Sequence, residues 1–72
     1  MFTVGNKVII KDNLGEELSR LGFDEFCVQN MSNVFIGTKQ EIYAIWNDSE
    51  TNQQYATIDL CVEIPIQCLE LI

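Results

Sequence analysis

Two carboxylates near the C-terminus, Asp59 and Glu63, first suggest chemistry, because paired carboxylates can act as a general acid and base. In an extended strand, however, residues four positions apart lie well over about 10 Å from each other, so these two do not share one small substrate. The sequence contains no histidine, which removes the usual proton-transfer group near neutral pH and any Cys–His or Ser–His nucleophile. We therefore expect a protein that is not an enzyme and has no catalytic residues.

Three cysteines, Cys27, Cys61 and Cys68, have no CxxC spacing and no histidine partner, so the sequence lacks a zinc motif. Cys61 and Cys68 could chelate a soft metal if they met in the fold, but burial as small apolar side chains is the commoner outcome. The run at 47–52 lacks the ligand order of a calcium loop and is interpreted as a solvated turn. We expect no metal, no cofactor and three reduced, shielded cysteines.

The charges are unevenly distributed along the chain. All four basic residues lie in residues 1–39, which carry a net charge of −1, whereas residues 40–72 carry six carboxylates and a net charge of −6. A total of −7 argues against direct binding to nucleic acid or an anionic membrane, since both require clustered cations. It favours a basic protein partner, or a role in solubility alone.

Length and hydropathy predict one small cytosolic domain, because 72 residues with 47% hydrophobic content can form a single core. No apolar stretch approaches the roughly 20 residues of a membrane-spanning helix, and the N-terminus does not resemble a signal peptide. Alternation over residues 3–11 predicts a strand with Val4, Val8 and Ile10 on its buried face, entered by a bend at residues 5–6.

Two short helices are expected next. Asn13 is placed to cap a helix over residues 14–21, and Gly22 to end it. Asp24, preceded by Phe23, is placed to cap a second helix, which Asn33 and Gly37 would end. The residues expected on the buried faces of these helices are Leu14, Leu18, Leu21, Cys27, Met31 and Val34, and Val28 lies where a hydrophobic staple would reach.

The segments KQEIYAIW (39–46) and QYATIDLCV (54–62) predict two strands that pair as an antiparallel hairpin across the polar stretch 47–53. Pro65 should stop the ladder, leaving residues 66–72 for a tight turn and a closing strand. The alternation places one mostly apolar set of side chains in the core: Ile42, Ala44, Trp46, Ala56, Ile58, Leu60 and Val62.

The opposite face of this predicted hairpin carries aromatic rings interleaved with carboxylates: Glu41, Tyr43, Tyr55, Asp59 and Glu63. These residues could be ordinary cross-strand pairs on a solvated sheet. They could also bind a basic protein, because tyrosine is a frequent interface anchor and carboxylates complement lysine and arginine. We take these five residues as the candidate partner-binding site.

The order of elements predicts an α+β, mostly β fold: a small SH3-like barrel or strongly bent antiparallel sheet with a short helical insertion after the first strand. The segments VGNKVIIKDNL, GFDEFCVQNMSNVFIGTKQEIYAIW and TIDLCVEIPIQCLELI resemble the small SH3-like proteins of phages and prophages of Gram-positive bacteria. The shared features are a Val-Gly-x-x-Val strand, a Met-centred helical segment, a Gly-Thr step and a Pro-x-x-x-Leu-Glu end. The longer segment at 14–21 and the cysteines depart from that pattern.

This resemblance implies a phage-type protein acting in the host cytoplasm. Ordered carboxylates can imitate the phosphates of nucleic acid, and phages use small acidic proteins in this way against restriction and CRISPR nucleases. The expected function is an acidic, DNA-mimicking inhibitor of a host defence nuclease, an anti-CRISPR protein whose first candidate target is a Cas9-type effector with positive nucleic-acid channels. The alternative is a phage assembly or regulatory adaptor that binds a protein or peptide, in which the charge provides solubility alone.

Overall fold

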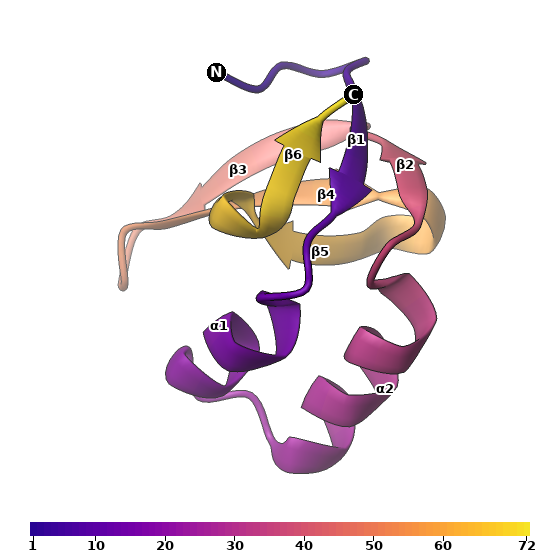
Figure 1. Ribbon diagram of the computed structural model, residues 1–72. Helices are drawn as coiled ribbons and strands as arrows, with labels where there is room; N and C mark the ends of the chain where they lie inside the picture. Colours follow the sequence, from indigo (N-terminus) through magenta and orange to yellow (C-terminus); the bar gives the residue numbers. More distant parts are fainter.

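The computed structural model describes residues 1–72, apart from the side chain of Leu60, and shows a small α+β fold (Figure 1). Its elements are β1 (Lys7–Ile10), α1 (Leu14–Arg20), α2 (Glu25–Phe35), β2 (Lys39–Glu41), β3 (Ala44–Asp48), β4 (Gln53–Ile58), the 3-10 turn η1 (Asp59–Cys61), β5 (Val62–Pro65), the 3-10 turn η2 (Ile66–Cys68) and β6 (Leu69–Leu71). The predicted α+β, mostly β class and the helical insertion after the first strand are confirmed.

The six strands form two antiparallel sheets of three strands each. Sheet A has the order β2-β1-β6, and sheet B has the order β3-β4-β5. The described strands do not close into a barrel. The two helices lie beside each other at one end of the molecule, with α1 against β5, and both chain termini lie at the opposite end (Figure 1).

A bend at Gly5 makes β1 shorter than the alternation predicted. Gly5 has φ of +94°, a conformation that favours glycine, and its N–H donates to the carbonyl of Ile42 at 2.8 Å. The strand therefore begins at Lys7, and its buried side chains are Val8 and Ile10. The prediction that Val4 is buried is wrong, because this residue precedes the bend and is 62% exposed.

A side-chain cap was expected at the start of both helices, but only α2 has one. Asp24 has extended backbone, and its Oδ1 accepts a hydrogen bond from the N–H of Cys27 at 2.9 Å, so the predicted cap of α2 is confirmed. Asn13 precedes α1 but makes no capping bond, because its φ and ψ of −79° and 4° depart from the extended conformation of a capping residue. Its Nδ2 instead lies 3.4 Å from the carbonyl oxygen of Gln67.

Helix α2 continues beyond the predicted break at Asn33 to Phe35, and Gly37 with φ of +82° follows it. Val28 is buried, whereas Met31 is half-buried. The prediction that Val34 lies in the core is wrong: this side chain is 60% exposed, on the same face of the helix as the exposed Phe26 and Asn30. No helix in the described part of the chain is both long and apolar enough to cross a membrane.

The predicted strand at 39–46 is two strands in different sheets. The N–H of Ile42 donates to Asn6 on the side of sheet A, and the N–H of Tyr43 donates to Thr57 in sheet B. Because the chain changes sheets between these neighbouring residues, the alternation does not continue through them. Ile42 is fully buried as predicted, but Ala44 and Trp46 are exposed, and the partly buried Ile45 packs on the core in their place.

The second predicted strand is also divided. After Ile58 the chain turns through η1, where Cys61 has φ of +62°, and β5 then runs back along β4. Glu63 lies opposite Thr57 and Val62 opposite Ile58 in this pairing, so the predicted division of faces survives the turn. Pro65 ends β5, and η2 and β6 form the expected turn and closing strand beside β1.

The core draws on both sheets and both helices, which explains how so short a chain buries one continuous cluster. Its buried members are Val8, Ile10, Leu14, Leu18, Val28, Ile42, Ala56, Ile58, Ile64, Cys68 and Leu69. The burial predicted for Leu14, Leu18, Ala56 and Ile58 is therefore confirmed, and Leu21 and Val62 are partly buried. The core position predicted for Leu60 falls on a side chain outside the described ones.

Candidate functional site

The five predicted partner-binding residues do not form one surface. Glu41 lies in β2 of sheet A, whereas the other four belong to sheet B or to the residues adjoining its strands. Tyr43, Asp59 and Glu63 are exposed, and Tyr55 is only 7% exposed. The change of sheet between Ile42 and Tyr43 is the physical reason for this separation.

Glu41 is also neutralised by a cation within its own sheet. Lys7 lies opposite Glu41 in the pairing of β1 with β2, and its Nζ donates to Glu41 Oε1. This hydrogen bond, together with the charge of Glu41, raises the pKa of Lys7. The expectation that Glu41 contributes to the same acidic face as Glu63 is therefore wrong.

Tyr55 belongs to an aromatic pair on the outer face of sheet B, the face directed away from the core. Trp46 lies directly opposite it on β3, and the two rings stack with centroids 4.8 Å apart and planes inclined by 19°. Burial, and to a smaller extent the charge of Asp48, raises the pKa of Tyr55. Tyr55 was predicted to be a solvent-facing contact and Trp46 a core residue, but Tyr55 is buried beneath a Trp46 ring that is 42% exposed.

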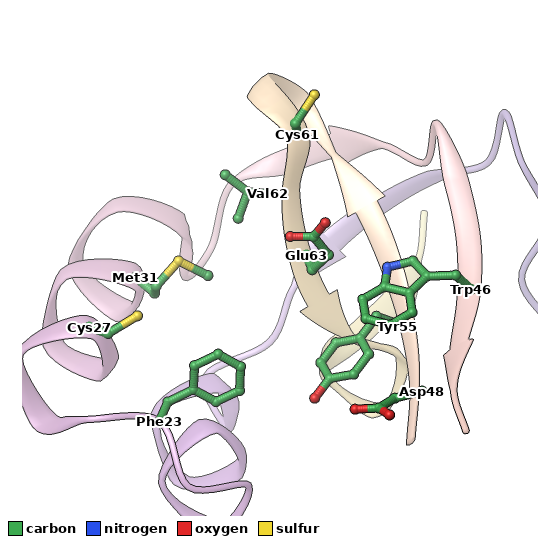
Figure 2. Close-up of a pocket in the computed structure, with 9 residues that line it drawn as sticks. All are labelled: Phe23, Cys27, Met31, Trp46, Asp48, Tyr55, Cys61, Val62 and Glu63. Carbon is green, nitrogen blue, oxygen red and sulfur yellow. The ribbon is translucent and has the colours of Figure 1, made fainter. Parts of the chain in front are cut away.

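A cleft of about 490 Å³ lies between the outer face of sheet B and the helical side of the molecule (Figure 2). Its lining residues are Phe23, Cys27, Met31, Trp46, Asp48, Tyr55, Cys61, Val62 and Glu63. Figure 2 shows Phe23 on the helical side, across the cleft from the Trp46–Tyr55 pair. We call this hollow the aromatic cleft.

Strand register places a carboxylate on each side of the aromatic pair. On the outer face, Glu63 lies opposite Thr57, which is two residues after Tyr55 on β4, and Asp48 is two residues after Trp46 on β3. Because β3 and β4 are antiparallel, the two carboxylates lie on opposite sides of the Trp46–Tyr55 pair. Among the described side chains the salt bridges are Lys7–Glu41 and Arg20–Glu17, so neither cleft carboxylate belongs to an ion pair. Asp48 Oδ1 accepts one hydrogen bond, from the backbone N–H of Glu50 at 3.0 Å.

A polar network fixes helix α1 beside this surface. Gln67 in η2 exchanges hydrogen bonds with the side chain of Gln53 and donates to Glu17 Oε1 at 2.8 Å, and Glu17 also accepts from Arg20. The bond from Gln67 and then those from Arg20 lower the pKa of Glu17. Arg20 is therefore paired within α1, and among the described side chains it forms no salt bridge with a cleft carboxylate, although its charge acts on Tyr55 and partly offsets the rise in the pKa of that tyrosine.

The cysteines occupy three different environments. All three are free thiols: Cys68 is buried in the core, Cys27 is half-buried, and Cys61 is exposed on η1. Burial raises the pKa of Cys68 to about 11. The expectation that all three are shielded is therefore wrong for Cys61, because the turn that divides β4 from β5 presents it to solvent. No group of three or more possible metal ligands occurs among the described residues.

Sequence reasoning found Tyr55 and Glu63 but missed Phe23, Trp46 and Asp48 as lining residues of one cleft. From the sequence, Phe23 is recognisable only as the residue before a helix cap, and Asp48 only as part of a polar turn. No family model, curated protein or solved structure matches this chain.

Proposed function

We propose that this protein is a non-enzymatic domain that binds a partner protein with a basic surface. The observation that carries the proposal is the separation of charge in three dimensions. Three lysines and three carboxylates lie on or beside the strands of sheet A, so that region has no net side-chain charge: Lys7, Lys11 and Lys39 with Asp12, Glu41 and Glu70. The helices and sheet B carry the whole net charge of −7.

We call the helices, their connection and sheet B, including the hairpin turn and η1, the acidic side. It carries one arginine, which is already paired within α1, and eight carboxylates. The carboxylates are Glu16, Glu17, Asp24, Glu25, Asp48, Glu50, Asp59 and Glu63. Charge concentrated in this way steers a basic partner toward one side of the molecule and repels nucleic acid and anionic membranes from it.

In its leading specific form, the proposal is that this protein is encoded by a phage or prophage and inhibits a host defence nuclease. The first candidate target is a Cas9-type effector. A rigid array of carboxylates can occupy a channel that is lined with cations for the phosphates of a nucleic acid. Support comes from Asp48 and Glu63, which project from paired strands and lack an ion-pair partner among the described side chains.

The aromatic cleft favours a second candidate, a phage assembly or regulatory adaptor that binds a peptide or protein segment. A role in solubility would require only charge. A cleft lined by Phe23, Trp46 and Met31 also offers apolar contact area to a ligand. An SH3-like ancestry belongs to this proposal. It is supported by the order of strand, helical insertion, hairpin, short turn and a closing strand that returns to β1.

Two variants of equal net charge test the proposal. The acidic-side variant carries Asp48→Asn, Asp59→Asn and Glu63→Gln, and the sheet A variant carries Asp12→Asn, Glu41→Gln and Glu70→Gln. Each tagged protein serves as bait in a host lysate, and the recovered proteins are quantified by mass spectrometry. We expect wild type and the sheet A variant to recover the same basic proteins, and the acidic-side variant to lose them.

Recovered partners then separate the two candidate functions. Inhibition of the DNA cleavage activity of a recovered nuclease supports the inhibitor, and recovery of structural or regulatory proteins without a nuclease supports the adaptor. Equal recovery by all three baits would contradict the proposal, because it would show that the position of the carboxylates has no influence on partner choice.

A further inference from the structure

We propose that the aromatic cleft binds an arginine side chain of the partner, with the guanidinium against the aromatic rings and beside a cleft carboxylate. This inference rests on the proposed binding of a basic protein and names the chemical group that the cleft recognises. It is carried by three features of the cleft: its aromatic rings, its carboxylates outside any described salt bridge and its place within the acidic side of the molecule.

The rings come from separate elements and meet at one hollow. Phe23 belongs to the connection between the helices, Trp46 to β3 and Tyr55 to β4, and all three line the cleft (Figure 2). Phe23 is 41% exposed and Trp46 42% exposed, although both are large apolar side chains in a chain with a small core. A cation within about 6 Å of an aromatic ring centroid is attracted to the ring face, most strongly for tryptophan.

The cleft carries two carboxylates that no described salt bridge neutralises. Glu63 and Asp48 lie on opposite sides of the Trp46–Tyr55 pair along the sheet, and no salt bridge engages either one among the described side chains. A cationic group that enters between Phe23 and this pair therefore has aromatic rings beside it and a carboxylate toward either end of the hollow. An uncharged apolar side chain would gain ring contacts but would desolvate the carboxylates without compensation.

Arginine matches this combination better than lysine. Its guanidinium is planar, stacks on aromatic faces, loses hydration more readily than an ammonium group and presents several N–H donors in one plane to carboxylates. The cleft volume of about 490 Å³ also accommodates a long side chain together with adjoining backbone. Lysine offers a compact, strongly hydrated charge that uses the ring faces less well.

The chain contains one tryptophan, so the fluorescence of Trp46 reports directly on this cleft. The probes are acetyl-Gly-Arg-Gly-amide and its counterparts in which citrulline, lysine or norleucine replaces arginine, all at constant ionic strength. Citrulline has nearly the shape of arginine without its charge. We expect the arginine peptide to bind roughly five- to thirtyfold more tightly than the citrulline peptide, and more tightly than the lysine and norleucine peptides.

Protein variants separate cleft binding from general attraction. Asp48→Asn with Glu63→Gln should remove most of the preference for arginine over citrulline, and Phe23→Leu should reduce it while keeping an apolar side chain. The matched control is Asp12→Asn with Glu70→Gln, which removes the same charge from the sheet A region and should keep the preference. Far-ultraviolet circular dichroism of each variant verifies that the fold is retained.

Equal binding of the arginine and citrulline peptides to wild type would overturn the inference, as would an equal loss of preference in the cleft variant and its control. Either result leaves the proposed function standing if a basic partner is still recovered with the acidic-side dependence described above. Loss of that dependence would remove the proposed function itself, so the two failures are distinguishable.

Discussion

At the scale of single residues, the position of Trp46 decides what the outer face of sheet B can do. The ring lies opposite Tyr55 and stacks on it, so the tyrosine is buried while the tryptophan is partly exposed to solvent. The alternating pattern correctly assigned Ala56 and Ile58 to the core, because β4 is regular over these positions. It assigned Trp46 to the wrong face, because a period of two cannot show a change of sheet that begins at Ile42.

Cysteine reactivity is a direct test of these residue environments. A thiol reacts as its thiolate, so exposure and pKa together set the labelling rate. We expect Cys61 to be alkylated first in the native protein, because it is exposed on η1. Cys68 should react at least about a hundredfold more slowly, since it is buried and burial raises its pKa to about 11.

Mass spectrometry of timed iodoacetamide reactions gives the rate at each thiol, with the unfolded protein in urea as the reference for full reactivity. Cys61→Ser is the matched control and should abolish the fast phase while leaving the slow ones. Rapid native labelling at Cys68, or protection at Cys61, would show that the turn and the core are arranged differently from this account.

At the scale of elements, the close contact between α1 and α2 depends on a residue without a side chain. A Cβ added to Gly15 would lie 2.9 Å from Ser32 Oγ, closer than real Cβ atoms approach such an oxygen. That hydroxyl is buried and has no hydrogen-bond partner among the described atoms. Gly15 therefore allows the helices to approach, at the cost of a more flexible unfolded chain.

A double-mutant cycle tests this contact. We expect Ser32→Ala alone to change the free energy of unfolding little, because it removes an unpaired buried hydroxyl. Gly15→Ala in that background should stabilise the protein by about 0.5–1 kcal/mol through reduced entropy of the unfolded chain. In the wild-type background the same change should be at least about 0.5 kcal/mol less favourable, because the new methyl group overlaps Ser32.

Urea unfolding followed by circular dichroism measures all four proteins of the cycle. Strict additivity of the two substitutions would show that residues 15 and 32 do not touch, and would place α1 and α2 farther apart. A Glu16→Ala substitution at the neighbouring exposed position supplies the reference for a change on α1 outside the contact.

Most elements were predictable from the sequence, since the cues for them are local. Asp24 marks the start of α2 through its own side chain, and Pro65 marks the end of β5 through its missing N–H. The division of each long predicted strand into two was not predictable, because KQEIYAIW and QYATIDLCV lack a proline or glycine at the break. At Ile42 and Cys61 long-range hydrogen bonding and a turn with positive φ override a favourable local pattern.

At the scale of the whole molecule, the fold makes the charge separation stronger than it is along the chain. The sequence predicts −1 in residues 1–39 and −6 in residues 40–72, whereas the fold leaves the sheet A region without net charge and places −7 on the acidic side. Pairing of β1 with β2 and β6 brings Glu41 and Glu70 back to the lysines of the N-terminal half. Because strand pairing is long-range, sequence order alone could not give this distribution.

We propose that the location of the carboxylates, rather than their number, determines binding to a basic partner. Association kinetics of the recovered partner with wild type, the acidic-side variant and the sheet A variant test it most directly. Each association is measured from about 0.01 M to about 1 M salt, over which the Debye length falls from about 30 Å to about 3 Å.

We expect the association rate of wild type to fall at least about tenfold over this range, and the sheet A variant to keep most of this dependence. The acidic-side variant, which has the same net charge as the sheet A variant, should associate more slowly at low salt and show a flatter dependence. Identical curves for the two variants, or a wild-type rate that does not change with salt, would show that the location of the carboxylates does not govern association.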